Sequence, residues 1–417
     1  MSLFSLFAIL ISVTALLSYF NERTLRLPPS IGVMAAALTG SILLILPGRL
    51  GLFPIEWAED LIDGIDFNAL LMRGMLSFLL FAGALHVNLN DLLKRKWSIL
   101  TLATAGVLLS TFLIGTTIYG ILAFLGLNLP YGYALLFGAL ISPTDPIAVL
   151  GILKTAGVSK DLETMIAGES LFNDGVGIVV FTMVSGLAIG GHAVHWTEAA
   201  ELFLLEAMGG VVYGLALGYI AYRLLKTINN YTVEILITLS LVAGGYALAA
   251  QIHTSGPIAM VVAGLFIGNH GRTFGMSERT REHLDNFWEL IDETLTAMLF
   301  VMIGFELLVL DIRPIFLFCG FLAIPVVLLM RFLSVGGPIS LLKLIRSFPP
   351  GTVTMMTWGG VRGGISIALA LSLVDSPHRD LILLITYAVV IFSILIQGLT
   401  IGRLARRWKI PDSPVQG

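Results

Sequence analysis

Apolar residues in this chain come in runs of about 20, the length with which a helix crosses the hydrocarbon layer of a membrane. Short stretches with charged residues, glycine or proline separate the runs. This pattern predicts an all-α membrane protein with about 13 transmembrane helices. An amphipathic, acidic stretch at 54–65 is expected to lie on the membrane surface. The predicted spans are 2–20, 31–46, 68–86, 97–125, 131–153, 161–189, 200–225, 232–250, 256–269, 286–308, 315–335, 351–373 and 380–404.

The composition supports this class and excludes others. Hydrophobic residues make up 57% of the 417 residues and charged residues 12%, against about 25% charged in soluble domains. A water-soluble domain and an enzyme with a single membrane anchor are therefore excluded. The net charge of −3 gives no basic surface for a nucleic acid, and the one cysteine, Cys319, allows no intrachain disulfide. The first run lacks a basic start and a cleavage pattern, so it is expected to be a retained span.

Positive charge in the loops predicts the orientation, because cytoplasmic loops retain Lys and Arg. With the N-terminus outside, the inner loops and the C-terminal tail hold eighteen cations, and the outer side holds three, Arg49, Arg313 and Arg379. We therefore expect an outer N-terminus and a cytoplasmic C-terminus. Three further cations fall inside spans: Arg73, Arg331 and Arg362.

The fifth span contains two prolines around a charged residue, in the sequence Ser142-Pro143-Thr144-Asp145-Pro146. Each proline removes a backbone donor and clashes with the preceding turn, so we expect the helix to open here. Inside a membrane an unwound stretch survives only where it lines a cavity or is buried in protein, and its free carbonyls can bind a hard cation. A charge at this depth usually marks a pathway or a pair.

The sixth span carries polar residues on two neighbouring faces. Ser170 and Asp174 are four residues apart and share one face, and Glu169 and Asn173 share the next. Asp145 and Asp174 each lie roughly 14 residues into their spans, about 21 Å along a helix and thus near the middle of the membrane. Antiparallel neighbours would bring these two carboxylates together.

A second weak point lies in the twelfth span, where four glycines surround Arg362 in the sequence WGGVRGG. Divided into six spans (1–190), a linker span (200–225) and six spans (231–404), the chain has a broken helix at the fifth position of each half. The odd linker makes the halves start on opposite sides of the membrane. This arrangement predicts six-helix inverted repeats, with two discontinuous helices that cross at the membrane midplane.

Three stretches closely resemble a known family. They are SPTDPIAVLGILKTAGVSKDLETMIAGESLFNDGVGIVVF, FWELIDETLTAMLFVMIGFEL and TWGGVRGGISIALALSL. The resemblance is to the monovalent cation:proton antiporters, in the branch of bacterial NhaP proteins and animal sodium/proton exchangers, and it extends over essentially the whole chain. It implies thirteen helices, a homodimer, and a core half that moves like an elevator against a dimerisation half. The implied activity is electroneutral exchange of one monovalent cation for one proton.

The resemblance also implies roles for individual residues. Asp174 matches the ion- and proton-binding aspartate, and Asn173 beside it marks the branch expected to exchange one cation for one proton. Thr144 and Asp145 match the cation ligands of the unwound helix, and Ser170 matches a hydroxyl ligand. Asp145 has an alternative role, as a cap on the positive N-terminal end of a half-helix.

Two arginines receive structural roles. Glu169 matches a carboxylate that pairs with an arginine of the eleventh span, here Arg331. Arg362 matches the arginine of the GGxRGG motif and is expected to compensate the negative end of a half-helix. The sequence leaves open whether Arg331 or Arg362 is the main partner of Glu169. The chain departs from some relatives at 81–84, where Phe-Ala-Gly-Ala replaces an acidic ligand.

The expected substrate is Na⁺, with Li⁺ or K⁺ as alternatives, because carboxylate, hydroxyl and carbonyl oxygens suit all three ions. No cofactor is expected, and the partners are membrane lipid and a second copy of the chain. The short tail after Leu404 predicts no cytosolic regulatory domain, and the expected location is a bacterial inner membrane. Three other functions are disfavoured. This chain lacks the Gly-x-Gly-Asp motif expected of an intramembrane aspartyl protease. A cation channel would need a polar path along its whole length, and an organic-anion transporter would not present a negatively charged site.

Overall fold

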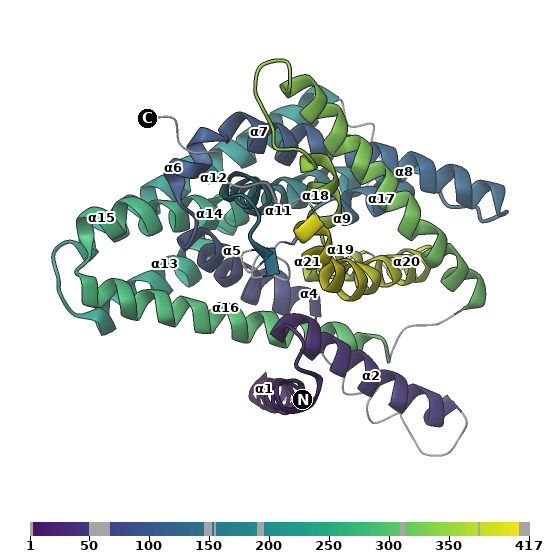
Figure 1. The fold of residues 1–417 in the computed structure, drawn as a ribbon, viewed down its shortest axis with the longest axis horizontal. Helices are drawn as coiled ribbons and strands as arrows, with labels where there is room; N and C mark the ends of the chain where they lie inside the picture. Colours follow the sequence, from purple (N-terminus) through teal and green to yellow (C-terminus); the bar gives the residue numbers. More distant parts are fainter. Residues whose placement is uncertain are drawn as a thin grey trace.

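Every regular element in the described part of the chain is a helix, which confirms the all-α prediction (Figure 1). The computed structural model describes residues 3–49, 67–145, 152–153, 156–189, 196–308, 313–373 and 376–407. The predicted surface stretch 54–65 lies outside these residues, as do residues 146–151 of the fifth span. The α-helices are α1 (Leu3–Phe20), α2 (Pro29–Arg49), α4 (Phe67–Ala69), α5 (Leu76–Leu85), α6 (Leu89–Lys94), α7 (Lys96–Thr101), α8 (Val107–Phe124), α9 (Tyr131–Ile141), α11 (Lys160–Ile189), α12 (Trp196–Leu225), α13 (Tyr231–Gln251), α14 (Gly256–Phe266), α15 (Arg272–Gly275), α16 (Glu278–Glu306), α17 (Pro314–Leu342), α18 (Thr352–Gly359), α19 (Gly364–Leu371), α20 (Arg379–Phe392) and α21 (Gly398–Arg407).

Short π-helical turns join several of these helices into longer rods. They are η1 (Asn21–Leu25), η2 (Leu70–Met75), η3 (Leu102–Gly106), η4 (Ile267–Gly271) and η5 (Ser393–Gln397). Counted this way, seven helical stretches in the described residues are long and apolar enough to cross a membrane, so the chain is a multi-pass membrane protein. The seven are Phe4–Leu25, Lys96–Phe124, Lys160–Ala188, Leu204–Leu225, Tyr231–Gln251, Pro314–Leu342 and Arg379–Arg407.

The helix that covers the predicted span 286–308 begins earlier than the sequence indicated. α16 starts at Glu278, and the Ser277 side chain caps it by accepting a hydrogen bond from the Thr280 amide at 3.3 Å. Its first two turns are charged, so a search for apolar runs passes over them. A long polar end on a membrane helix is compatible with a helix that extends beyond the hydrocarbon layer.

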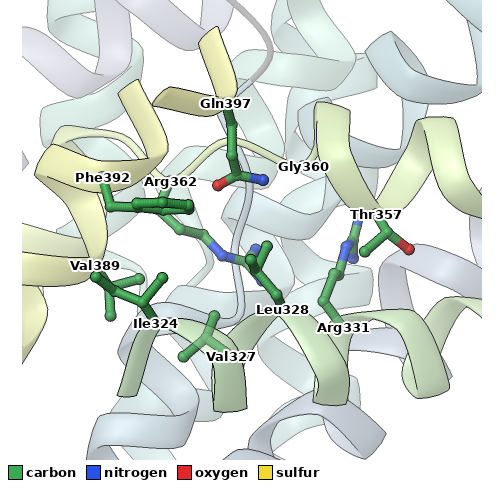
Figure 2. A pocket seen from close by; sticks show the side chains of 10 residues that line it. All are labelled: Ile324, Val327, Leu328, Arg331, Thr357, Gly360, Arg362, Val389, Phe392 and Gln397. Atoms are coloured by element: carbon green, nitrogen blue, oxygen red, sulfur yellow. The ribbon is translucent and has the colours of Figure 1, made fainter. Parts of the chain in front are cut away.

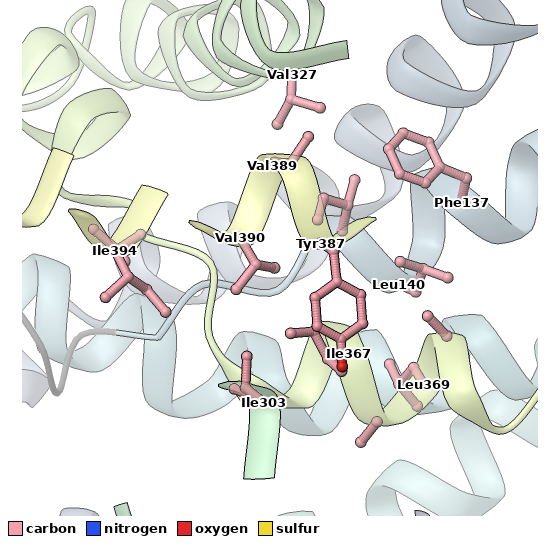
Figure 3. Packing of buried hydrophobic residues seen from close by; sticks show 14 of the residues in the cluster. Phe137, Leu140, Ile303, Val327, Ile367, Leu369, Tyr387, Val389, Val390 and Ile394 are labelled. Atoms are coloured by element: carbon pink, nitrogen blue, oxygen red, sulfur yellow. The ribbon is translucent and has the colours of Figure 1, made fainter. Parts of the chain in front are cut away.

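The buried apolar side chains form two clusters. The first is centred on α9, α17, α19 and α20, where residues such as Phe137, Val327, Ile367 and Val389 interlock (Figure 3). The second joins α5, α12, α13, α14 and α16 around Trp288, whose ring lies 4.7 Å from that of Phe81. These two groups of helices occupy different sides of the molecule in Figure 1.

Helix α11 belongs to both clusters. Its Leu171 packs in the second, and Val176 and Val180 pack in the first. The polar sequence of α11, from Glu169 to Asp174, therefore lies where the two groups of helices meet. A site at such a boundary is shaped by both groups.

Ionic contacts tie together three loops that the charge count had placed on one side of the membrane. Asp91 bonds Lys94 at 2.9 Å and Lys160 at 3.0 Å, and Arg95 pairs with Asp161. Arg346 also donates to the Lys94 carbonyl at 2.7 Å. The loops after α6, before α11 and after α17 are thus neighbours. The hydrogen bonds from Lys94 and Lys160 lower the pKa of Asp91 below its usual 3.8.

Candidate ion-binding site

Helix α9 ends where the prolines indicated. Its last residue is Ile141, and the following residues, up to Asp145, are not helical. Ser142 donates to the Gly138 carbonyl at 2.6 Å, and its side chain is fully buried. Buried backbone polar groups need partners, so the unwound stretch has to be held by neighbouring elements.

The second break lies directly beside the first. α18 ends at Gly359 and α19 begins at Gly364, and the residues between them are not helical. The Asp145 amide donates to the Val361 carbonyl at 2.7 Å, which joins the two unwound stretches. A Cβ on Gly363 would overlap the Asp145 carboxylate, so only glycine fits there. Asp145 therefore lies against the residue that caps the N-terminus of α19, where the helix dipole favours negative charge.

Hydroxyl and amide side chains of α11 hold the first break. The hydroxyls of Thr144 and Ser170 are 2.8 Å apart. Asn173 donates from Nδ2 to the Thr144 hydroxyl at 2.8 Å, and its Oδ1 accepts from the Thr144 amide at 3.2 Å. All three side chains are buried. The Asn173 side chain thus hydrogen-bonds both the backbone amide and the hydroxyl of Thr144.

Asp174 is buried beside this network, with 7% of its surface exposed. Among the described residues none donates a hydrogen bond to its carboxylate, and the charged groups that act on it are the carboxylates of Asp145 and Glu169. An ionised carboxylate in such a place is costly unless a positive charge reaches it. A proton or a small cation can supply that charge.

Glu169 has an arginine partner within the same buried region. Arg331 on α17 donates from Nη2 to Glu169 Oε2 at 2.6 Å, and both side chains are almost fully buried. The other carboxylate oxygen accepts from Asn173 Nδ2 at 3.3 Å. The ion pair and the Thr144 network therefore share Asn173.

Arg362 points to the end of α9 rather than to a carboxylate. Its Nη1 donates to the carbonyls of Ser142 at 2.8 Å and of Pro143 at 3.0 Å. Its backbone amide donates to Ser393 Oγ at 2.9 Å. A guanidinium at these carbonyls opposes the negative end of α9. Figure 2 shows Arg362 and Arg331 on the wall of one small cavity, with Gln397 above them.

Two residues of α16 were given no role by the sequence interpretation. Asp292 is half-buried and interacts electrostatically with Asp145, and Thr296 is 2% exposed. An acidic residue in the predicted span 286–308 was a signal that could have identified Asp292. It was overlooked because the first half of that helix is generally acidic, and such a face is usually solvated.

The chain is similar to known proteins over almost its whole length. The profile of the family described as sodium/hydrogen exchanger, transmembrane, matches residues 9–407. The Na⁺/H⁺ antiporter NhaP of Pseudomonas aeruginosa is 53% identical over 408 residues, which cover 96% of each chain. The Na⁺/H⁺ antiporter NhaH of Halobacillus dabanensis is 35% identical over 402 residues, covering 93% of this chain and 97% of that protein.

The fold is also similar to a solved structure. The sodium proton antiporter MjNhaP1 from Methanocaldococcus jannaschii, solved at pH 8, superposes with a TM-score of 0.75 over 98% of this chain and 99% of that one, at 20% identity. The family profile and the full-length relatives confirm the family that the sequence motifs indicated. This chain belongs to the sodium/hydrogen exchanger family, and it is a transporter rather than an enzyme.

Proposed function

We propose that this protein is a secondary active antiporter that exchanges Na⁺ for H⁺ in a 1:1, electroneutral cycle. The observation that carries the proposal is the environment of Asp174, a buried carboxylate with acidic neighbours and no donor among the described residues. Such a group holds either a proton or a cation, and the two exclude each other. If one carboxylate binds either one proton or one cation, each cycle moves one proton across the membrane in one direction and one cation in the other, with no net charge transferred.

The proposed cation ligands are the oxygens around the first break. Asp174 supplies the carboxylate, Thr144 and Ser170 supply the touching hydroxyls, and Asp145 adds a second carboxylate at the α19 terminus. These are hard oxygen ligands, which suit an alkali-metal ion. Asn173 orients Thr144 and adds no charge, which supports a cycle in which only one carboxylate changes its proton. No cofactor takes part.

The proposed architecture has 13 spans, in two inverted repeats joined by the linker helix α12. The two breaks would cross at the membrane midplane. The contacts between the two breaks support this arrangement. Asp145, in the first break, lies at the positive N-terminus of α19, and Arg362, in the second break, lies at the negative C-terminus of α9. Alternating access would come from an elevator-like movement of this core within a homodimer. We place the N-terminus outside and the C-terminus in the cytoplasm of a bacterial cell, in its inner membrane.

The proposal is tested by reconstituting the purified protein in liposomes with an acidic interior, which quenches a pH-sensitive dye. Adding Na⁺ outside should restore the fluorescence, and Asp174→Asn should abolish this response while the protein remains folded. Li⁺ and K⁺ are added in parallel experiments. A larger response to K⁺ than to Na⁺ would show that K⁺ is the main substrate. If Asp174→Asn exchanged ions at the wild-type rate, the proposed role of Asp174 as the binding group for cation and proton would be wrong.

A further inference from the structure

Asp292 is a half-buried carboxylate that the proposed cycle does not use. It lies on α16, its Oδ1 is buried without a hydrogen-bond partner in the described part of the chain, and the acidic groups that act on it are Asp145, Glu293 and Glu289. The side chains of Glu289 and Glu293 are exposed, so Asp292 is the acidic residue of this turn that faces the protein. An uncompensated carboxylate in this position favours a cation beside it.

Thr296 lies one turn further along the same face of α16. It is 2% exposed, and its hydroxyl has no hydrogen-bond partner among the residues that the structure describes. Other buried helical threonines of this chain, such as Thr14 and Thr386, donate to the carbonyl four residues earlier, each at 2.7 Å. The Thr296 hydroxyl does not make this bond, so it is available to a ligand beside Asp292.

This face of α16 packs next to the ion-binding site. The Leu299 side chain fills the space beside Gly364, so that a Cβ on Gly364 would lie within 2.7 Å of three Leu299 carbons. Gly364 begins α19, and Gly363 before it contacts Asp145. Asp292, Thr296 and Leu299 thus follow one another along α16 toward the break that holds Asp145.

We propose that Asp292 and Thr296 form, with Asp145, a second binding station for a monovalent cation on the path to Asp174. The station deepens the proposed function and rests on it, because its ligand is the transported ion. Its ligands are again hard oxygens: two carboxylates and a hydroxyl. Asp145 would belong to both stations, so a cation could pass from Asp292 to Asp174 without leaving the reach of a carboxylate.

The test measures initial exchange rates in proteoliposomes as a function of Na⁺ concentration, at fixed pH and fixed ionic strength. Asp292→Asn should raise the KM for Na⁺ by about fivefold or more, which corresponds to about 1 kcal/mol of lost cation affinity, with kcat within about twofold of wild type. Thr296→Val should raise KM by a smaller factor, and Thr296→Ser should restore the wild-type value. The matched control is Glu293→Gln, which removes the same charge from the neighbouring exposed position and should leave KM unchanged.

An equal rise of KM in Asp292→Asn and Glu293→Gln would overturn the inference, because it would show a general effect of surface charge. An unchanged KM in Asp292→Asn would overturn it as well. If Asp292→Asn does not fold, the Thr296→Val and Thr296→Ser pair decides alone, and equal KM values for the two would refute the station. Failure of the proposed function is distinct, since the wild-type protein would then show no exchange.

Discussion

The buried pair of Glu169 and Arg331 allows a sharp test of the site's energetics. Replacing Glu169 by Gln leaves the Arg331 guanidinium in the core without its countercharge, with the neutral amide oxygen and Met356 O, at 3.5 Å, as the acceptors near it among the described residues. Its Nε and Nη1 have no hydrogen-bond partner within the described ranges even in the wild-type protein. Removing one partner of a buried pair costs about 3–5 kcal/mol, and we expect Glu169→Gln to lie at the upper end.

The reverse change should cost less. Arg331→Met keeps most of the side-chain volume, and Glu169 retains its hydrogen bond from Asn173 at 3.3 Å. A stranded carboxylate can also take up a proton, whereas arginine stays charged. The double variant removes both charges, so its loss should be smaller than the sum of the single losses by about 1–3 kcal/mol.

Thermal unfolding in detergent, followed by tryptophan fluorescence, measures these differences. The expected order of melting temperature is wild type, then Arg331→Met, then Glu169→Gln, with the double variant above the value that additivity gives. A second cycle that combines Glu169→Gln with Arg223→Ala is the control, because Arg223 lies on the exposed surface of α12 and bonds Tyr219. Strict additivity in the Glu169–Arg331 cycle would refute the coupling and direct attention to Arg362.

Three further predictions follow from other parts of the molecule. Gly363→Ala should reduce the exchange rate by at least about tenfold, because the new methyl group would overlap the Asp145 carboxylate. Gly337→Ala is the control and should leave the rate unchanged, because there is open space around Gly337. Exchange rates in proteoliposomes measure both effects. Exchange should be electroneutral, so an imposed membrane potential should not drive it; a steady-state current that scales with Na⁺ would contradict this. Asp91→Asn should lower the melting temperature slightly at neutral pH, because Lys94 and Lys160 depress the pKa of Asp91. This stabilisation is present above pH 3.8 and is lost as the pH falls through the lowered pKa, so wild type and variant should converge in acid, and a difference that persists there would count against the ionic contribution.

The sequence predicted the all-α membrane class and the ends of particular helices, because strong local signals determine these features. Runs of apolar residues predicted the membrane class, and the prolines at 143 and 146 predicted the end of α9, since a missing backbone donor acts whatever the surroundings. The glycines around Arg362 predicted the gap between α18 and α19. The start of α16 was predicted too late, because a capped and charged first turn is invisible to a search for apolar runs.

The contacts within the site were harder to predict, because they depend on packing between distant segments. No local pattern could show that Asn173 hydrogen-bonds Thr144. The Glu169–Arg331 pair and the place of Arg362 at the carbonyls after α9 were indicated only by the family resemblance, which left the main partner of Glu169 open. Asp292 was missed for a similar reason. On an acidic helix the sequence alone does not separate a half-buried carboxylate from its exposed neighbours.

The most direct test of the central claim is the pH dependence of exchange at several Na⁺ concentrations. If cation and proton compete at Asp174, the rate at fixed Na⁺ should be bell-shaped in pH, because protons block cation binding in acid and become scarce in base. Raising the Na⁺ concentration should move the acid limb to lower pH, by about one pH unit for each tenfold increase when binding is fully competitive. An acid limb that stays at the same pH at every Na⁺ concentration would show that the two ions do not share a site, and would contradict the account.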